Sequence, residues 1–410
     1  LYDAGKFIAA DVWLKARRSV DINRPRAARQ AAGLMGAPLA RRVGDALDTP
    51  PRYLAQHGST ATRNQAEMAA LALTRLANKD PEMTAAMLAD RWERDLPADL
   101  AAWVWASAGR EAAQNLSPQA PQYFQRAAKV AAKSRQPIEW SDDTLAWKVR
   151  AALRAEEGRG RWQQVVQAIN AMTPEQQRDP AWVYWKARAL LASPNVANHR
   201  AEATALLQGI ASPRGFYEQL ALEELGQKVT APARPAPLTA DEKEAARLNA
   251  TLNRALYAMA IGLRPEGVRE WNYGTNLARP GGMNDRELLA AAQFACDREV
   301  WDRCINTSER TRAEVDVEQR FPMPFRDAVV KRSREIDLDP AYVYGLIRQE
   351  SRFIMDARSH VGASGLMQVM PATARWTARK IGLTNFTADQ INDRDTNIAI
   401  GTGYLKLVLD

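Results

Sequence analysis

Apolar positions follow a helical period near the end of the chain. Asp339–Pro340 predicts a helix start, with aspartate as N-cap and proline in the first helical position. Counting from there, Val343, Leu346 and Ile347 occupy one face at positions i, i+3 and i+4, and Glu350 follows at i+7. The pattern predicts a helix over residues 340–351, with a carboxylic acid where a core residue is expected.

A carboxyl group on an apolar helix face is a candidate general acid. Burial penalises the charged form, so Glu350 would keep a proton at neutral pH and deliver it to a leaving group. The alternative is a glutamate at the domain rim, in water or paired with Arg348 or Arg352. The segment 362–371 favours the acid, since it reads GASGLMQVMP. Its glycines, unbranched apolar side chains and single amide, Gln368, are typical of a ligand groove.

The first 240 residues also have a helical pattern, and parts of it repeat. Residues 146–153, AWKVRAAL, return as residues 184–191, YWKARALL, and Trp13–Arg17 echoes them. Alanine-rich helices with aromatic residues on one face suit stacked helical hairpins, each too small to bury its face alone. We therefore expect an all-α fold that begins with an α-superhelix over residues 1–240. Its helix starts are expected at Asp80–Pro81, Ser117–Pro118, Thr173–Pro174, Asp179–Pro180 and Ser212–Pro213.

A proline-rich stretch then separates this region from the rest. Residues 229–238 read VTAPARPAPL, which is typical of an extended linker. A helical pattern returns over 241–320, where we expect a small helical domain, and FPMP at residues 321–324 marks the next boundary. The last domain, 321–410, should hold helices over 325–336, 340–351, 371–381 and 395–409, with Pro371 at a helix start and Gly382 after a helix end.

Composition and charge narrow the function classes. The 410 residues allow two or three domains, and 46% hydrophobic with 25% charged residues is ordinary for a soluble globular protein. A net charge of +8 suits an anionic partner. However, the basic residues are dispersed, and neither zinc-ligand spacing nor a ribonucleoprotein motif is present. We expect no nucleic-acid partner; such binding would show a steep dependence on salt.

Other classes of chemistry are disfavoured by the scarcity of the residues that they need. No run of 18 apolar residues indicates a membrane span, and three histidines and two cysteines are too scattered for a metal site. We expect neither a metal nor another cofactor, and no serine triad stands out. Cys296 and Cys304 flank a predicted turn between two short helices, either as buried thiols or as a disulfide.

A longer motif around the acid resembles a known family. Glu350-Ser351-x-Phe353, residues 357–359 (ARS) and residues 362–374 (GASGLMQVMPATA) are similar to the catalytic core of the soluble lytic transglycosylases. These enzymes cut bacterial peptidoglycan with a lysozyme-like domain. The chain departs from the family pattern after Phe353, where Ile354–Met355 replaces a polar residue and proline, so the path of that loop is left open.

The resemblance assigns roles residue by residue. It implies that Glu350 is the catalytic glutamate and that Ser359, Gln368 and Met370 line the sugar-binding groove. From the residues alone, Ser359 can equally be a turn former, Gln368 an exposed polar residue and Met370 a core residue. The resemblance further implies a U-shaped superhelix, a small linker domain, and about the first half of the catalytic domain over residues 321–410, as expected of a fragment.

The implied reaction is a cleavage without water. Glu350 would protonate the β-1,4 bond between N-acetylmuramic acid and N-acetylglucosamine, then deprotonate the C6 hydroxyl, which closes on C1 as a 1,6-anhydro end. A lysozyme would use a second carboxylate roughly 5 to 9 Å away. Asp356 and Asp389 are the nearest downstream, and we expect both to be solvated loop or cap residues, which favours ring closure.

The family also implies a place and a partner. We expect a monomer in the bacterial periplasm, acting on glycan strands and meeting other cell-wall proteins. The chain opens at Leu1 without a signal-like segment, so a signal has been removed or the sequence begins inside the protein. Two alternatives stay open: a hydrolytic lysozyme, and a peptide-binding helical-repeat scaffold whose lysozyme-like end is inactive.

Overall fold

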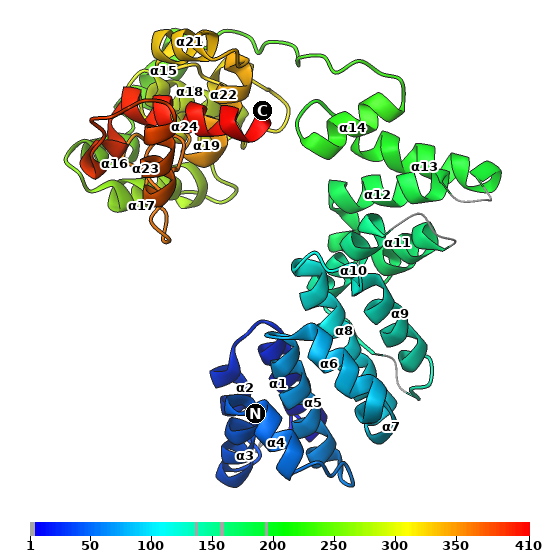
Figure 1. The fold of residues 1–410 in the computed structure, drawn as a ribbon. Helices are drawn as coiled ribbons and strands as arrows, with labels where there is room; N and C mark the ends of the chain where they lie inside the picture. The colour runs from blue at the N-terminus through cyan, green and yellow to red at the C-terminus, as the bar shows by residue number, and fades with distance from the viewer. Residues whose placement is uncertain (1–4, 136–137, 156–159, 193–195) are drawn as a thin grey trace. The chain divides into compact units, whose positions relative to one another are not determined.

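The computed structural model describes residues 5–135, 138–155, 160–192 and 196–410. These residues form two compact units, Leu1–Val229 and Thr230–Asp410 (Figure 1). Both consist of helices, and the only β pairing in the described ranges is two isolated bridges that join Ser364 to Arg358 and to Val369. The all-α prediction is confirmed.

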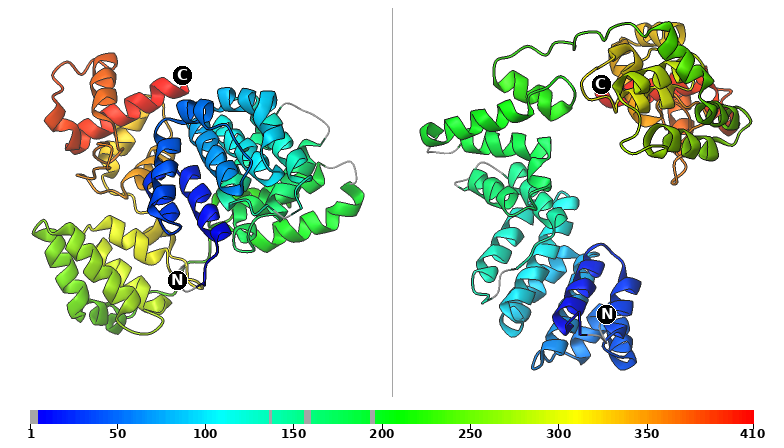
Figure 2. Two further views of the ribbon diagram at one scale, coloured as in Figure 1. Left: turned by 90° about the horizontal axis from the view of Figure 1, so that it is seen from below. Right: turned by 180° about the vertical axis from the view of Figure 1, so that it is seen from behind.

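The first unit is a succession of helical hairpins, each packed on the next (Figures 1 and 2). Its core is rich in alanine, which allows close approach between helices. The helices are α1 (Ala9–Asp21), α2 (Pro25–Gly33), α3 (Ala37–Asp48), α4 (Pro50–Gln56), α5 (Arg63–Ala77), α6 (Pro81–Met87), the π-helix η1 (Leu88–Trp92), α7 (Glu93–Asp95), α8 (Ala98–Gln114), α9 (Ala120–Ala131), α10 (Asp142–Arg154), α11 (Arg161–Asn170), the 3-10 turn η2 (Gln176–Arg178), α12 (Pro180–Leu191), α13 (Val196–Ile210) and α14 (Phe216–Glu224).

The sequence repeat corresponds to a structural repeat. Residues 146–153 lie in α10 and residues 184–191 lie in α12, and each of these helices is the first of a hairpin, α10 with α11 and α12 with α13. Trp13 lies in α1, again the first helix of a packed pair, and is buried. The prediction of stacked helical hairpins is confirmed.

The proline signals marked helix starts only where aspartate precedes the proline. The carboxylates of Asp80 and Asp179 accept hydrogen bonds from the first turns of α6 and α12, which begin at the following proline. In contrast, α9 begins at Ala120, two residues after Pro118, because the Ser117 hydroxyl closes a separate turn with Gln119. The other two signals likewise lie upstream of η2 and α14.

The second unit begins with residues 230–239, the larger part of the extended segment 229–239, which contains no helix, as predicted. It then holds α15 (Ala240–Leu248), α16 (Ala250–Ala260), α17 (Arg264–Asn272), the π-helix η3 (Tyr273–Leu277), α18 (Asp285–Cys296), α19 (Trp301–Ser308), α20 (Val317–Arg320), α21 (Arg326–Glu335), α22 (Pro340–Glu350), α23 (Pro371–Lys380), the 3-10 turn η4 (Ala388–Asn392) and α24 (Arg394–Leu409).

Two hydrophobic cores meet at α19. Cys304 belongs to the core formed by α15 to α18, whereas Ile305 belongs to the core formed by α21 to α24. Both residues are fully buried. Residues 230–410 therefore pack as one unit, and the finer division at residue 320 stays a prediction.

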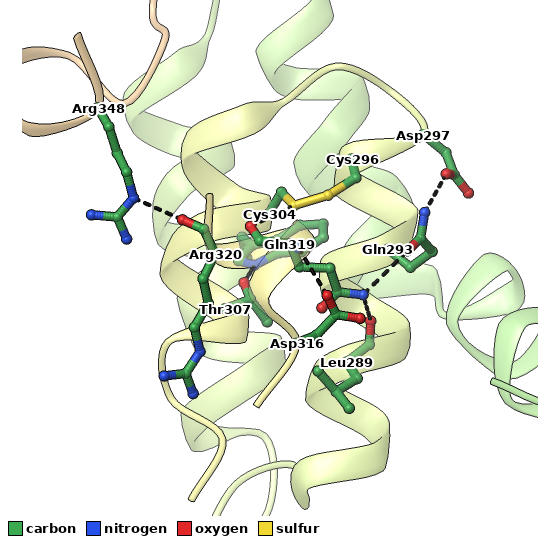
Figure 3. Close-up of a disulfide and its surroundings, with 11 residues drawn as sticks. Leu289, Gln293, Cys296, Asp297, Cys304, Thr307, Asp316, Gln319, Arg320 and Arg348 are labelled. Atoms are coloured by element: carbon green, nitrogen blue, oxygen red, sulfur yellow. Dashed lines mark hydrogen bonds between the residues drawn. A yellow bond between two sulfur atoms is a disulfide. The ribbon is translucent and has the colours of Figure 1, made fainter. Parts of the chain in front are cut away.

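The structure joins Cys296, the last residue of α18, to Cys304 of α19 in a disulfide (Figure 3). Their Cα atoms lie 5.1 Å apart, which is within the usual range for such a bond. Of the two states left open by the sequence, the structure has the disulfide. It fastens α19 to α18 across the turn that the sequence indicates.

Candidate active site

The helix of the candidate acid starts where the sequence predicts. Asp339 caps α22, its carboxylate accepting a hydrogen bond of 2.8 Å from the amide of Ala341, and Pro340 is the first helical residue. Val343 and Ile347 are fully buried and Leu346 is partly buried. The apolar stripe of α22 thus packs on the domain core.

Glu350 departs from that stripe. It is the last residue of α22 and its side chain is exposed, so the prediction of a buried Glu350 is wrong. The helix ends at this residue, and the chain leaves the helical path directly after it. Phe353 is buried instead, with its ring 6.1 Å from that of Tyr344.

The chain turns sharply just after Glu350. Arg352 and Phe353 have φ angles of 50° and 65°, in the left-handed region that side chains rarely adopt. The Ser351 hydroxyl stabilises the turn, since it donates to the carbonyl of Ile347 and accepts from the amide of Phe353 at 3.1 Å. The direction in which Glu350 leaves α22 therefore depends on an unusual backbone turn.

The carboxylate of Glu350 is not paired with the neighbouring arginines. Arg348 and Arg352 both bind Glu309, at 2.5 and 2.6 Å. In the described part of the chain, Glu350 makes no side-chain hydrogen bond or ion pair. Its oxygens are thus open to a ligand or to water.

Ser359 shapes the loop that follows. Its hydroxyl accepts a hydrogen bond of 2.9 Å from the amide of Ala363, and its own amide donates to the Ala363 carbonyl. The residue is partly buried. The structure therefore places Ser359 as a turn former, one of the two roles that the sequence left open.

Gln368 closes the same loop from its other end. Its side-chain nitrogen donates to the carbonyls of Ala357 and Gly365, both at 2.9 Å. Its backbone has a φ of 47°. Both amide protons are used inside the protein, so Gln368 is neither a simple exposed residue nor a free donor to a sugar.

Gly365 lets the loop lie against η4 and α24. Its φ is 78°, and a Cβ atom there would lie 2.8 Å from the carbonyl oxygen of Ile391 and collide with the amide of Asn397. Only glycine fits both the conformation and the space. The close approach indicated by the glycines of this segment is thus present at Gly365.

Asn397 is a site residue that the sequence analysis missed. Its buried side chain accepts from the amide of Met367 at 2.8 Å and donates to the carbonyls of Ser364 and Ile391. The available signal was an amide within the apolar run of α24, where a polar residue needs partners. Asn397 holds the loop on α24.

Met370 lies at the surface, directly before α23, with 40% of its area exposed. Its reading as a core residue is therefore wrong, because the backbone leaves the loop here to start the helix. Trp376 and Tyr404 are also exposed, and their rings pack edge to face at 6.3 Å. This aromatic pair, which the sequence analysis did not predict, adds apolar surface to the domain.

The two downstream acids considered in the sequence analysis do not lie in apolar surroundings. Asp356 and Asp389 are both exposed, as expected, and a hydrogen bond from the Thr387 hydroxyl lowers the pKa of Asp389. Among the residues that the structure describes, no cluster of His, Cys, Asp or Glu could hold a metal ion. Within the same ranges, we find no helix with the length and hydropathy of a bilayer span.

The site therefore consists of one solvent-open carboxylate followed by a tightly bonded loop. Ser359 and Gln368 belong to that loop, and Met370 ends it. None of these three side chains hydrogen-bonds to Glu350 within the described ranges. Glu350 can exchange a proton with a bound molecule, and the exposed apolar side chains can contact one.

Comparisons with known proteins identify this domain. Residues 327–410 match the family model described as the transglycosylase SLT domain. The soluble lytic murein transglycosylase of Salmonella typhimurium is 31% identical over 228 residues, which cover 55% of this chain and 34% of that protein. Its counterpart from Escherichia coli is 26% identical over 337 residues, covering 77% and 50%. The chain thus spans half or less of the length of these relatives.

Solved structures extend the likeness to nearly the whole chain. An inactive mutant of lytic transglycosylase Slt from Pseudomonas aeruginosa matches with a TM-score of 0.73 and 28% identity, over 99% of this chain and 64% of that one. The 70 kDa soluble lytic transglycosylase from Escherichia coli shares the fold, with a TM-score of 0.69 and 23% identity over 99% and 63%. The resemblance seen in the sequence is therefore confirmed: residues 327–410 match the SLT domain family, and the chain is similar to soluble lytic murein transglycosylases.

Proposed function

We propose that the protein is a peptidoglycan lytic transglycosylase with Glu350 as its catalytic residue. The observation that carries this proposal is the carboxylate of Glu350, exposed and without a protein partner in the described ranges, at the head of a loop inside the SLT match. The Pseudomonas aeruginosa relative supports it, because its inactive form replaces a glutamate by glutamine.

The proposed reaction needs one carboxyl group. Protonated Glu350 gives its proton to the oxygen of the β-1,4 bond between N-acetylmuramic acid and N-acetylglucosamine. The bond from C1 to that oxygen breaks, and positive charge develops at C1. The Glu350 carboxylate then removes the proton of the C6 hydroxyl, and O6 bonds to C1. Atoms balance without water, and the muramoyl end becomes a 1,6-anhydro ring.

A second acid is not required for this route. Retaining glycosidases place two carboxyl groups about 5 Å apart and inverting ones about 6.5 to 9.5 Å. The nearest downstream acids, Asp356 and Asp389, are exposed residues of the loop and of η4. Their placement favours the substrate's own hydroxyl as the nucleophile.

The other site residues are proposed to shape the substrate groove. The side chains of Ser359 and Gln368 make their hydrogen bonds within the loop, so we propose that they stabilise its conformation. Met370, exposed beside the loop, is assigned to packing on a sugar ring. We also propose that the protein acts as a monomer in the bacterial periplasm, with glycan strands as its partner.

Digestion of isolated sacculi tests the function. Intact protein should release muropeptides with 1,6-anhydro ends, and Glu350→Gln should lower that release by about a thousandfold, since it removes the proton donor. Glu335→Gln, an exposed exchange on α21, serves as the matched control. Mass spectrometry of the products reads the outcome: reducing ends would indicate a lysozyme, and an equally active Glu350→Gln would sink the assignment.

A further inference from the structure

We propose that Glu309, which follows the last turn of α19, is a positioning residue for Glu350. This inference rests on the proposed function. Glu309 comes from the helical region 241–320, outside the residues that match the SLT domain. It would make that region part of the machinery that orients the acid.

One carboxylate is bound by the two arginines that flank Glu350. Arg348, two residues before the acid, contacts Glu309 at 2.5 Å, and Arg352, two residues after it, contacts the other oxygen at 2.6 Å. The end of α22 and the following turn are thus tied to the same group. Glu350 lies between the two ties.

The second tie holds the strained part of the turn. Arg352 has a φ of 50°, and its guanidinium also donates to the side-chain oxygen of Asn306 on α19. A left-handed conformation at an arginine persists only where surrounding contacts enforce it. Glu309 and Asn306 supply those contacts, and the direction of the Glu350 side chain follows from the turn.

The first tie also fixes the junction between the two helical regions. Arg348 donates from Nε to the carbonyl of Arg320 at 2.7 Å (Figure 3). Its guanidinium also lies over the ring of Phe321, at 4.4 Å. The end of α22 is therefore held by the chain segment at residues 320–321 as well as by Glu309.

The helix that precedes Glu309 is held in place by packing and by a disulfide. Ile305, one turn earlier on α19, is fully buried in the core of the SLT region, and Cys304 is bonded to Cys296 of α18. Burial tends to raise the pKa of Glu309, but hydrogen bonds from Arg352 and Arg348 outweigh it and hold the pKa below its ordinary value. Glu309 therefore stays charged and keeps both ties at neutral pH.

Glu309→Gln tests the inference by separating positioning from binding and from folding. Glutamine keeps the shape and loses the charge that both arginines use, so kcat on sacculi should fall about 10- to 100-fold while KM changes little. Glu309→Asp should recover part of kcat. The matched control is Glu314→Gln, which removes a carboxylate from the same helical region. Glu314 binds Arg286, at 3.1 Å, rather than a residue of α22.

A second measurement does not depend on activity. Amide hydrogen exchange in a peptide covering residues 348–356 should be faster in Glu309→Gln than in wild type, and unchanged in Glu314→Gln. Wild-type exchange in this peptide sets the reference. If wild type releases no anhydro ends, the proposed function fails, and the exchange result still decides whether Glu309 holds the turn.

Four outcomes would overturn the inference. The first is a kcat of Glu309→Gln within twofold of the control in an active enzyme, and the second is a rise in KM at unchanged kcat. The third is an equal loss of kcat in the glutamine and aspartate variants that tracks a loss of thermal stability, since that would reduce Glu309 to a structural contact. Unchanged exchange over residues 348–356 would count against it as well.

Discussion

Asp21, at the end of α1, is a buried carboxyl group that makes the stability of the first unit depend on pH. Its Oδ1 accepts a hydrogen bond of 2.8 Å from the Ser107 hydroxyl. Burial raises its pKa from 3.8 to about 6, although the nearby Arg110 and Ser107 act in the opposite direction. The folded state therefore binds a proton more tightly than the unfolded chain.

The sign of the effect follows from that difference. Stability from the protonated form is complete below the unfolded value of 3.8 and is lost as the pH rises through about 6. We predict that Asp21→Asn gains stability relative to wild type between pH 4 and pH 8, by up to about 3 kcal/mol. Urea melts across that range measure it. Asp90→Asn, at an exposed position, should show no such trend.

Two glycines of the loop that follows Glu350 form a matched pair. Gly365→Ala should lower the free energy of unfolding by about 2 to 4 kcal/mol, because it adds a collision with Ile391 and Asn397 to the strain of a positive φ. Gly362→Ala, also at positive φ but with open space around it, should cost only about 1 kcal/mol. Equal costs in denaturant melts would contradict the close packing of Gly365.

Sequence reasoning singled out Glu350 as the candidate acid but misjudged its environment. Periodicity places Val343, Ile347 and Glu350 on one face, yet it does not say that α22 ends at Glu350 and that Phe353 fills the core. Asn397 was missed for a different reason. Its partners lie far away in sequence, and only the packed loop brings them together.

At the scale of elements, helix starts with a local chemical cause were predicted best. Asp339–Pro340 and Pro371 mark α22 and α23 because a side-chain cap or a fixed φ acts within a few residues. Gly382, at a φ of 77°, follows the end of α23 as expected. The internal bonding of the loop 351–370 was not predictable in this way, since it depends on contacts with α24.

The disulfide between Cys296 of α18 and Cys304 of α19 leads to a prediction at the scale of elements. We expect no reactive thiol in the denatured protein without reductant, and two after reduction, because both cysteines are paired. A double variant, Cys296→Ser with Cys304→Ser, should lose about 2 to 3 kcal/mol, the entropy of a loop closed over 8 residues. Thiol titration and urea melts check the two statements, and free thiols in the untreated protein would contradict both.

At the scale of the whole molecule, the two units are joined by an extended, largely exposed segment at residues 229–239. We predict that limited trypsin digestion produces a fragment that starts at Val229, after the exposed Lys228. Arg234, in the same segment, should resist because Pro235 follows it. N-terminal sequencing of the fragments identifies the cut, and a Lys228 site that survives digestion of the helical regions would argue against an accessible linker.

The stacked hairpins of the first unit and the helix-free segment after them were predictable from the sequence. The repeated alanine-rich pattern predicted stacked hairpins, and the prolines predicted the linker, because both signals are local and repeated. The joint packing of residues 241–320 with residues 321–410 was not foreseen. It depends on single side chains of α19 whose destinations no periodicity reveals.

Cys304 and Ile305 are neighbours in the chain but belong to different hydrophobic cores, so α19 is buried on more than one face. A change that displaces α19 from one core also disturbs the other, because both cores need the side chains of α19 to stay packed. Residues 230–410 should consequently melt in one cooperative step, and a destabilising change near α18 would lower the population of molecules with an ordered acid.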